Sequence, residues 1–244
     1  MSATVTIATA RRVLSQLRHD HRTLAMLIVV PCVLLSLLAW VFDGTGTFDG
    51  VGAPLLGIFP FVIMFLVTSV ATLRERTSGT LERLLTMPIG KLDLLVGYAL
   101  AFGLVAVVQA SAATALAATL LGLDVAGPVW LLLVIAVMDA LLGMALGLLV
   151  SAFAATEFQA VQFMPAFVLP QFLLCGLLVP RERMDDILQA VSDVLPLSYA
   201  VDAMRDLSSN EGVGSSAWGD LSVVALAIVL ALGLGAATLR RRTP

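Results

Sequence analysis

The chain has 244 residues, of which 59% are hydrophobic and only 13% are charged, with a formal net charge of -3. Soluble domains carry about 25% charged residues, so this composition excludes a soluble enzyme, which needs far more polar surface. The two cysteines, Cys32 and Cys175, lie far apart in apolar runs, which argues against a disulfide scaffold or a zinc site. The composition therefore predicts an all-α membrane protein.

Six apolar runs are long enough to cross a bilayer as helices, which takes about 20 residues each. Gly, Pro, Asp and Ser separate the runs, as is usual for loops. No short-period repeat and no linker divides the chain, so residues 1–244 are predicted to form a single transmembrane domain. The predicted spans cover residues 24–42, 53–73, 94–121, 129–153, 158–179 and 218–239.

The distribution of Lys and Arg predicts the orientation of these spans, because cytoplasmic loops are enriched in both residues. With a cytoplasmic N-terminus, eleven of the fourteen basic residues fall on the cytoplasmic side, in the N-terminal segment, the loop at 74–93 and the C-terminal tail. The other three lie in the loop after the fifth run. We therefore expect a multi-pass protein of the cell membrane (inner or plasma membrane) with both termini in the cytoplasm.

The N-terminal segment 1–23 is predicted to form an amphipathic helix on the cytoplasmic face of the membrane. It combines apolar residues with four arginines, whose charges gain from anionic lipid headgroups. The alternative is a basic tail that only orients the first span. His19 and His21 flank Asp20 in this segment, and we interpret the two histidines as surface groups rather than metal ligands.

Residues 181–210, between the fifth and sixth runs, predict two short amphipathic helices interrupted by Pro196. Both are too short and too charged to cross a bilayer. We expect them to lie as re-entrant helices at the outer interface, beside the fifth run. The alternative is an ordinary folded extracellular loop.

The loop at 74–93 predicts a short helix over 80–86, which the residue pair Met87-Pro88 ends. A short helix with an apolar edge, held between two spans at the cytoplasmic face, is typical of a docking element. Seven residues of this loop, with their spacing, resemble permeases of the ABC-2 type. They are Glu75, Arg76, Gly79, Thr80, Glu82, Leu85 and Pro88.

Two further stretches are similar to the same family, and the resemblance extends from the N-terminus to the sixth run. One is Gly176-Leu177-Leu178-Val179-Pro180, which leaves the fifth run. The other is Leu195-Pro196-Leu197-Ser198-Tyr199, before the last run. The resemblance implies six transmembrane helices, an amphipathic N-terminal interfacial helix, a short cytoplasmic coupling helix and outer re-entrant helices.

The resemblance also implies a function, namely a permease subunit of an ATP-driven exporter for a hydrophobic or amphiphilic substrate such as a drug, an antibiotic or a lipid. Such permeases pair as homodimers or heterodimers, and each half docks a separate ABC ATPase subunit. The chain has no G-x-x-x-x-G-K-[ST] motif. We therefore expect no catalysis and no cofactor in this chain, ATP and Mg in the partner ATPase, and contacts with membrane lipid but not with nucleic acid.

Site residues follow from the same resemblance. The implied coupling residues are Glu75, Arg76, Gly79, Thr80, Glu82, Arg83, Leu85 and Pro88. In this family the second and fifth spans line the export path, and both runs here carry aromatic or amide side chains. Ordinary packing within the bundle is the alternative, and both interpretations stay open. The implied pathway residues are Phe61, Phe65, Gln162, Phe163, Phe167 and Gln171.

Asp139 is the single acid deep inside a predicted span, where a charge costs about 2.5–3.5 kcal/mol. Either it contacts a cation or the substrate, or it packs against the third run through a hydrogen bond. In the second case its candidate partners are Gln109, Ser111 and Thr114.

Gly143 and Gly147 lie one helical turn apart and predict close helix packing, within one half or between two halves of a dimer.

Two other classes of function are weighed against a permease. A secondary transporter usually has inverted repeats and several ionisable groups within its spans, whereas this chain has one acid and no clear repeat. An intramembrane enzyme needs a nucleophile with its base, paired cysteines or metal ligands within the spans, and both histidines here precede the first span. An ATPase subunit that remains bound to the chain in mild detergent would distinguish the permease from both.

Overall fold

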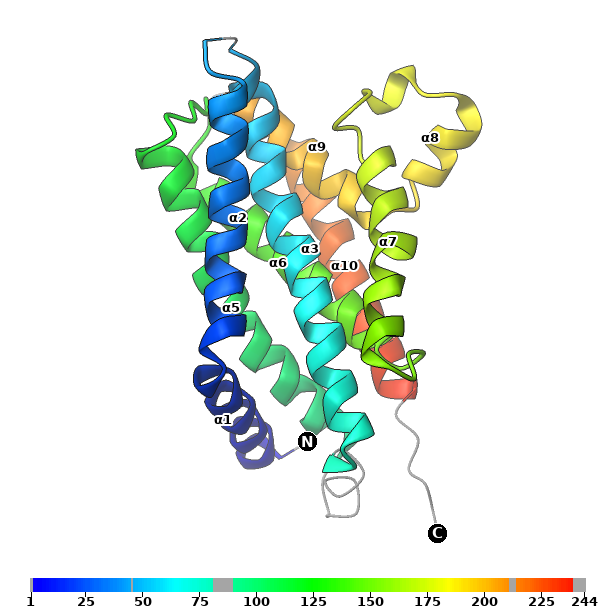
Figure 1. The fold of residues 1–244 in the computed structure, drawn as a ribbon. Helices are drawn as coiled ribbons and strands as arrows, with labels where there is room; N and C mark the ends of the chain where they lie inside the picture. The colour runs from blue at the N-terminus through cyan, green and yellow to red at the C-terminus, as the bar shows by residue number, and fades with distance from the viewer. Residues whose placement is uncertain (1, 45, 81–89, 211–213, 239–244) are drawn as a thin grey trace.

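The computed structural model describes residues 2–44, 46–80, 90–210 and 214–238, and these parts of the chain contain helices and no strand (Figure 1). The predicted all-α class is therefore confirmed. A single 3-10 turn, Arg181–Arg183, precedes α8. The α-helices are α1 (Ala3–His19), α2 (His21–Val41), α3 (Thr47–Thr77), α5 (Lys91–Thr119), α6 (Val129–Val150), α7 (Glu157–Leu174), α8 (Asp186–Ser192), α9 (Pro196–Ser209) and α10 (Ser215–Thr238).

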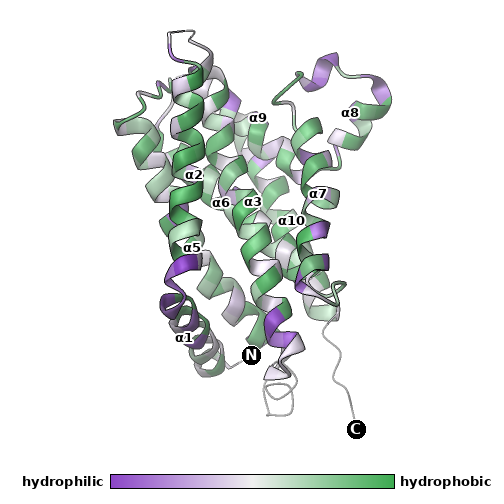
Figure 2. Ribbon diagram, viewed as in Figure 1, coloured by the Kyte–Doolittle hydropathy of each residue, from purple (hydrophilic) through white to green (hydrophobic). Residues whose placement is uncertain are grey.

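Five helices of the described chain, α2, α3, α5, α6 and α10, are long and apolar enough to cross a membrane. Figure 2 shows hydrophobic residues along these helices and hydrophilic ones at α1 and the end of α3. The remaining predicted run, 158–179, does not reach this standard. It forms α7, which has 18 residues, ends at Leu174 and contains Pro165 and Pro170. Three glutamines also lower its hydropathy, so the structure shows five candidate spans where the sequence predicted six.

The centre of the bundle is the contact between α3 and α6, whose backbones touch. A Cβ atom at Gly143 would lie 2.1 Å from the Phe61 carbonyl oxygen, and one at Gly147 would lie 2.4 Å from the Phe65 carbonyl oxygen. The predicted close packing at these two glycines is confirmed, and it occurs within the chain. The helices α5, α9 and α10 pack against other sides of α6.

Helix α1 lies across one end of the bundle, which we call the α1 end, where α2 begins (Figure 1). The predicted N-terminal helix is confirmed, and it packs against α5. Gly97 of α5 allows this contact, because a Cβ atom there would lie 2.6 Å from the Thr9 Cβ atom. The side chain of Asp20 then caps α2 by accepting a hydrogen bond from the Thr23 backbone N–H at 3.1 Å.

The two short helices predicted within 181–210 are confirmed as α8 and α9, with Pro196 in the first turn of α9. Their position differs from the prediction for α9, which was expected at the interface beside the fifth run. Instead α9 packs against α3, α6 and α10, because Leu197, Val201 and Met204 form a fully buried apolar face. Helix α8 remains outside, with 74% of Ile187 exposed.

Asp139 is fully buried in α6, but its surroundings differ from those predicted. A Cβ atom at Gly57 of α3 would lie 2.6 Å from the Asp139 Oδ2 atom, so this carboxyl group faces α3. Neither carboxyl oxygen has a hydrogen-bond partner among the described residues. The interpretation in which Asp139 hydrogen-bonds to α5 is therefore wrong, because Asp139 lies on the side of α6 that faces α3. The side chains of Gln109 and Thr114 on α5 are likewise buried without a hydrogen-bond partner among the described residues.

Candidate functional site

The last turns of α3 are tied to two other helices by one arginine of α1. Arg12 donates from Nη1 and Nη2 to the two Glu75 carboxylate oxygens, both at 3.0 Å, and from Nη2 to the Tyr98 hydroxyl of α5 at 3.0 Å. The Arg12 and Glu75 side chains are 28% and 13% exposed, so this bidentate pair is shielded from much of the solvent. The network fixes α1, α3 and α5 to one another at the α1 end.

Two further arginines connect the end of α3 to other helices. Arg76 donates from Nη1 to the Ser151 carbonyl oxygen at 2.9 Å, which satisfies a free carbonyl at the C-terminus of α6. Arg74 forms a bidentate pair with Glu157 of α7, at 2.8 and 3.0 Å. Both of these side chains are at least half exposed, so this pair contributes little to stability. The end of α3 is thus bonded to α1, α6 and α7, and it is linked to α5 through Arg12.

The structure describes four of the predicted coupling residues. Glu75 and Arg76 bind groups of this chain, while Gly79, with φ of +72°, has the left-handed backbone that ends α3. The Thr80 hydroxyl lies 3.0 Å from the Ser78 hydroxyl. The other four predicted coupling residues, Glu82, Arg83, Leu85 and Pro88, lie outside the described residues.

A groove of about 510 Å³ lies between α2 and α3, with α1 at one end and α5 behind it. Its α3 wall is formed by Ile63, Leu66, Val67, Val70 and Ala71, which repeat every three or four residues and therefore share one helix face. The remaining apolar lining residues are Val13, Leu17, Met26, Val30, Phe102 and Val161.

The end of the groove near α1 is polar. Asp20, Arg74 and Glu75 carry its charges, and Gln16, Thr23 and Tyr98 add uncharged polar groups. Asp20 accepts hydrogen bonds from the Thr23 hydroxyl at 2.6 Å and from the Thr23 backbone N–H, which lower the pKa of Asp20 and keep it ionised at neutral pH. The groove therefore combines an apolar wall with a charged end.

The structure separates the predicted pathway residues into two groups, and none of the six lines this groove. Phe61 and Phe65 are fully buried, and their backbone lies against α6. On α7, Gln171 is 4% exposed and donates from Nε2 to the Phe167 carbonyl oxygen at 3.2 Å. Phe167 is exposed and packs edge-on against Phe163 at 6.2 Å between ring centres, and Gln162 is also exposed.

The α3 wall of the groove was missed by reasoning from the sequence, although a signal was present. Ile63, Leu66, Val67 and Val70 follow the spacing of one helix face. Helical spacing of apolar residues is a weak signal in a transmembrane span, because nearly every residue there is apolar and every face of the helix shows the same spacing. The choice of Phe61 and Phe65 came from their aromatic character, which the structure uses for packing.

A bundle of long apolar helices, with a crosswise helix and arginine networks at one end, defines a multi-pass membrane protein. Residues 4–207 match the model of the family described as "ABC-2 type transporter", so the chain belongs to this family. It thus contains the membrane permease domain of an ABC transporter.

Several named permeases are similar to this chain. It is 28% identical over 167 residues to "Probable multidrug ABC transporter permease YbhR" of Escherichia coli K12, which covers 68% of this chain and 45% of that protein. It is 26% identical over 147 residues to YbhS of the same strain, covering 60% and 39%. "Linearmycin resistance permease protein LnrN" of Bacillus subtilis 168 is 22% identical over 183 residues, covering 75% and 47%. The chain thus spans less than half the length of each of these relatives.

Proposed function

We propose that the chain is the permease subunit of an ATP-driven exporter that moves a hydrophobic or amphiphilic substrate, such as a drug, an antibiotic or a lipid. A separate ABC ATPase subunit, which holds ATP and Mg, drives it, and a second permease chain completes the transporter. One observation carries the proposal. Helix α3 forms the apolar wall of the groove, and the same helix leads directly into the loop that the family uses to dock its ATPase.

The lining of the groove supports an amphiphilic substrate. Its volume of about 510 Å³ lies in the range of small-molecule sites, which is about 300–1,000 Å³. An apolar body can lie along Val67 and Val70, while a polar or cationic group reaches Asp20 at the other end. The names of YbhR, as a probable multidrug permease, and LnrN, as a linearmycin resistance permease, agree with substrates of this kind.

The contacts at the end of α3 support mechanical coupling to an ATPase. Helix α3 is continuous over 31 residues, so a displacement of its last turn also moves the groove wall. Glu75 carries the same displacement to α1 and, through Arg12, to α5, while Arg76 carries it to α6. In this proposal the two residues couple the ATPase by joining helices within the permease, rather than by touching the ATPase.

Orientation and span number belong to the same proposal. In Figure 1 α1 and the end of α10 lie at the same end of the bundle, which requires an even number of crossings. Helix α7 runs beside α3 and supplies the sixth crossing in addition to the five apolar helices. The basic residues of α1 and of the α3 terminus support a cytoplasmic position of the α1 end.

The test uses proteoliposomes that contain the full chain and its ABC ATPase, with ATP hydrolysis measured while amphiphilic dyes such as ethidium are added. Val67→Trp fills the groove and is expected to abolish stimulation by the dye while basal hydrolysis is retained. Leu226→Trp is the matched control, because Leu226 is 58% exposed on α10, away from the groove. Stimulation that survives Val67→Trp in a folded protein would refute the groove, and transport without any bound ATPase would refute the exporter.

A further inference from the structure

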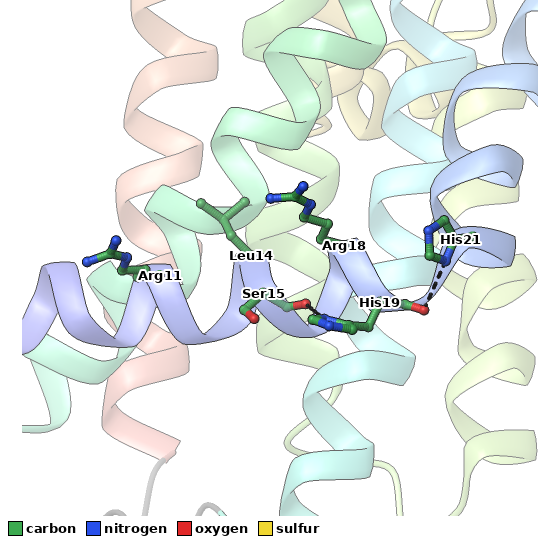
Figure 3. Close-up of a pocket in the computed structure, with 6 residues that line it drawn as sticks. All are labelled: Arg11, Leu14, Ser15, Arg18, His19 and His21. Atoms are coloured by element: carbon green, nitrogen blue, oxygen red, sulfur yellow. Dashed lines mark hydrogen bonds between the residues drawn. The ribbon is translucent and has the colours of Figure 1, made fainter.

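A second concave surface, which we call the crook, lies outside the groove, where α1 meets the start of α2. It has a volume of about 580 Å³, and Arg11, Leu14, Ser15, Arg18, His19 and His21 line it. Figure 3 shows Arg11, Leu14 and Arg18 projecting from the same side of α1, with His21 at the start of α2. Arg11 and Arg18 are seven residues apart, which separates them by about 10 Å along the helix axis.

The crook holds positive charge that no described carboxylate neutralises. Arg11 and Arg18 are exposed, and no carboxylate of the described chain pairs with either of them. Arg12, by contrast, turns to Glu75 and lies outside the crook. Asp20, the nearest acid in the sequence, lines the groove and is bound by Thr23. The crook therefore presents two guanidinium groups to an anion.

Both histidines of the crook are held to the backbone through one ring nitrogen. The His19 Nδ1 atom lies 2.6 Å from the Ser15 carbonyl oxygen, and the His21 Nδ1 atom lies 3.2 Å from the His19 carbonyl oxygen. These contacts, drawn in Figure 3, leave Nε2 of each ring for a ligand. The two contacts fix both rings at the junction of α1 and α2.

The depth of the crook in the membrane follows from α2, since His21 is the first residue of a helix that crosses the bilayer. Directly above His21 on the same helix face lie Ala25 and Val29, both exposed apolar residues that face lipid. The crook is therefore at the level of the headgroups, and an apolar surface rises from it into the hydrocarbon region.

We propose that the crook binds the phosphate of an anionic phospholipid, whose headgroup lies between Arg11 and Arg18 and whose acyl chains run along Leu14 and the exposed face of α2. Guanidinium groups bind phosphate through paired, charge-assisted hydrogen bonds. The continuity with the apolar face of α2 favours a lipid over a soluble phosphate or an acidic protein surface. The bound lipid holds α1 at the membrane surface, which adds a lipid requirement to the proposed export function.

The test is native mass spectrometry of the full chain, purified from membranes of equal phosphatidylglycerol and phosphatidylcholine content. The wild-type chain is expected to retain phosphatidylglycerol selectively. Arg11→Gln and Arg18→Gln are each expected to weaken its binding about five-fold, from the interaction of one arginine with an anionic membrane surface. Arg22→Gln is the matched control, because Arg22 is exposed nearby but does not line the crook.

Each outcome decides the proposal. Loss of phosphatidylglycerol in the Arg11 and Arg18 variants, but not in the Arg22 variant, supports it. Equal loss in all three indicates general surface charge and overturns it. Inorganic phosphate that binds the wild-type chain in pure phosphatidylcholine, with the same dependence on Arg11 and Arg18, identifies a site for a free anion and overturns the assignment to a lipid. If the wild-type chain does not retain phosphatidylglycerol selectively, the proposal is overturned before any variant is measured.

Discussion

Replacement of Gly143 by alanine tests the contact at the centre of the bundle. The added Cβ atom would lie 2.1 Å from the Phe61 carbonyl oxygen and 2.8 Å from its carbonyl carbon. Ordinary van der Waals contact begins at 3.4 Å. The obstructing atoms belong to the backbone of α3, so no side-chain rotation relieves the overlap, and α3 and α6 must move apart by about 1 Å.

The expected cost is that of an overpacked core, about 1–3 kcal/mol, which corresponds to a decrease of roughly 2–12 °C in the midpoint of thermal unfolding for a chain of this size. Gly147→Ala should have a similar effect, because its Cβ atom would lie 2.4 Å from the Phe65 carbonyl oxygen. Gly233→Ala in α10 is the control. No atom lies within 4 Å of its added Cβ, and alanine favours a helix over glycine by about 1 kcal/mol.

The assay follows the reaction of a fluorogenic maleimide with Cys175 in detergent during heating. Cys175 is fully buried and therefore reacts only when the bundle opens. A Cys32→Ala background removes the signal of the half-buried second cysteine. The reasoning is refuted if Gly143→Ala unfolds at the same temperature as Gly233→Ala, since α3 and α6 would then have room that the structure does not show.

Three further predictions test the polar groups. In a double-mutant cycle of Arg12→Ala and Glu75→Ala, thermal unfolding should give a coupling free energy of about 1–2 kcal/mol, because the ion pair is bidentate and partly shielded from solvent. A coupling free energy near zero would contradict the network. Asp139→Asn should unfold at the same or a higher temperature, because neither carboxyl oxygen has a partner to lose among the described residues, and a drop of several degrees would reveal one. Because its pKa is lowered, ionised Asp20 stabilises the fold above its ordinary pKa of 3.8, and this contribution is lost as pH falls through the folded value. The difference in unfolding temperature between wild type and Asp20→Asn should therefore shrink in acid, and a difference that persists below the folded pKa would exclude this origin.

The elements of the fold were mostly accessible from the sequence. Apolar runs of sufficient length identified α2, α3, α5, α6 and α10, and the basic amphipathic pattern identified α1. The run that became α7 is less apolar than these five helices, because its glutamines and prolines lower its hydropathy although its length is adequate. The two helices within 181–210 were also predicted. The position of α9 was not, because its apolar face packs in the core against α3, α6 and α10.

The candidate site was harder to predict from the sequence, because the role of a residue in a helical bundle depends on which neighbouring helix its side of the helix contacts. The family resemblance selected Glu75 and Arg76 as coupling residues, but only the structure shows Arg12 and Ser151 as their partners, 63 and 75 residues away in the chain. The aromatic residues Phe61 and Phe65 were predicted to line a pathway, but both are fully buried within the bundle.

The sequence by itself determined that this chain is a membrane protein, that it is helical and that its positive charge is concentrated in α1 and at the end of α3. These properties follow from local hydropathy and charge, which each segment carries wherever it lies. Only the tertiary structure decided that Gly57 meets Asp139, that the α3 face at Val67 borders a groove, and that Arg12 pairs with Glu75 while no described carboxylate pairs with Arg11 or Arg18. In a span where almost every residue is apolar, helical periodicity does not distinguish one face from another, so the choice belongs to the packing of the neighbouring helices.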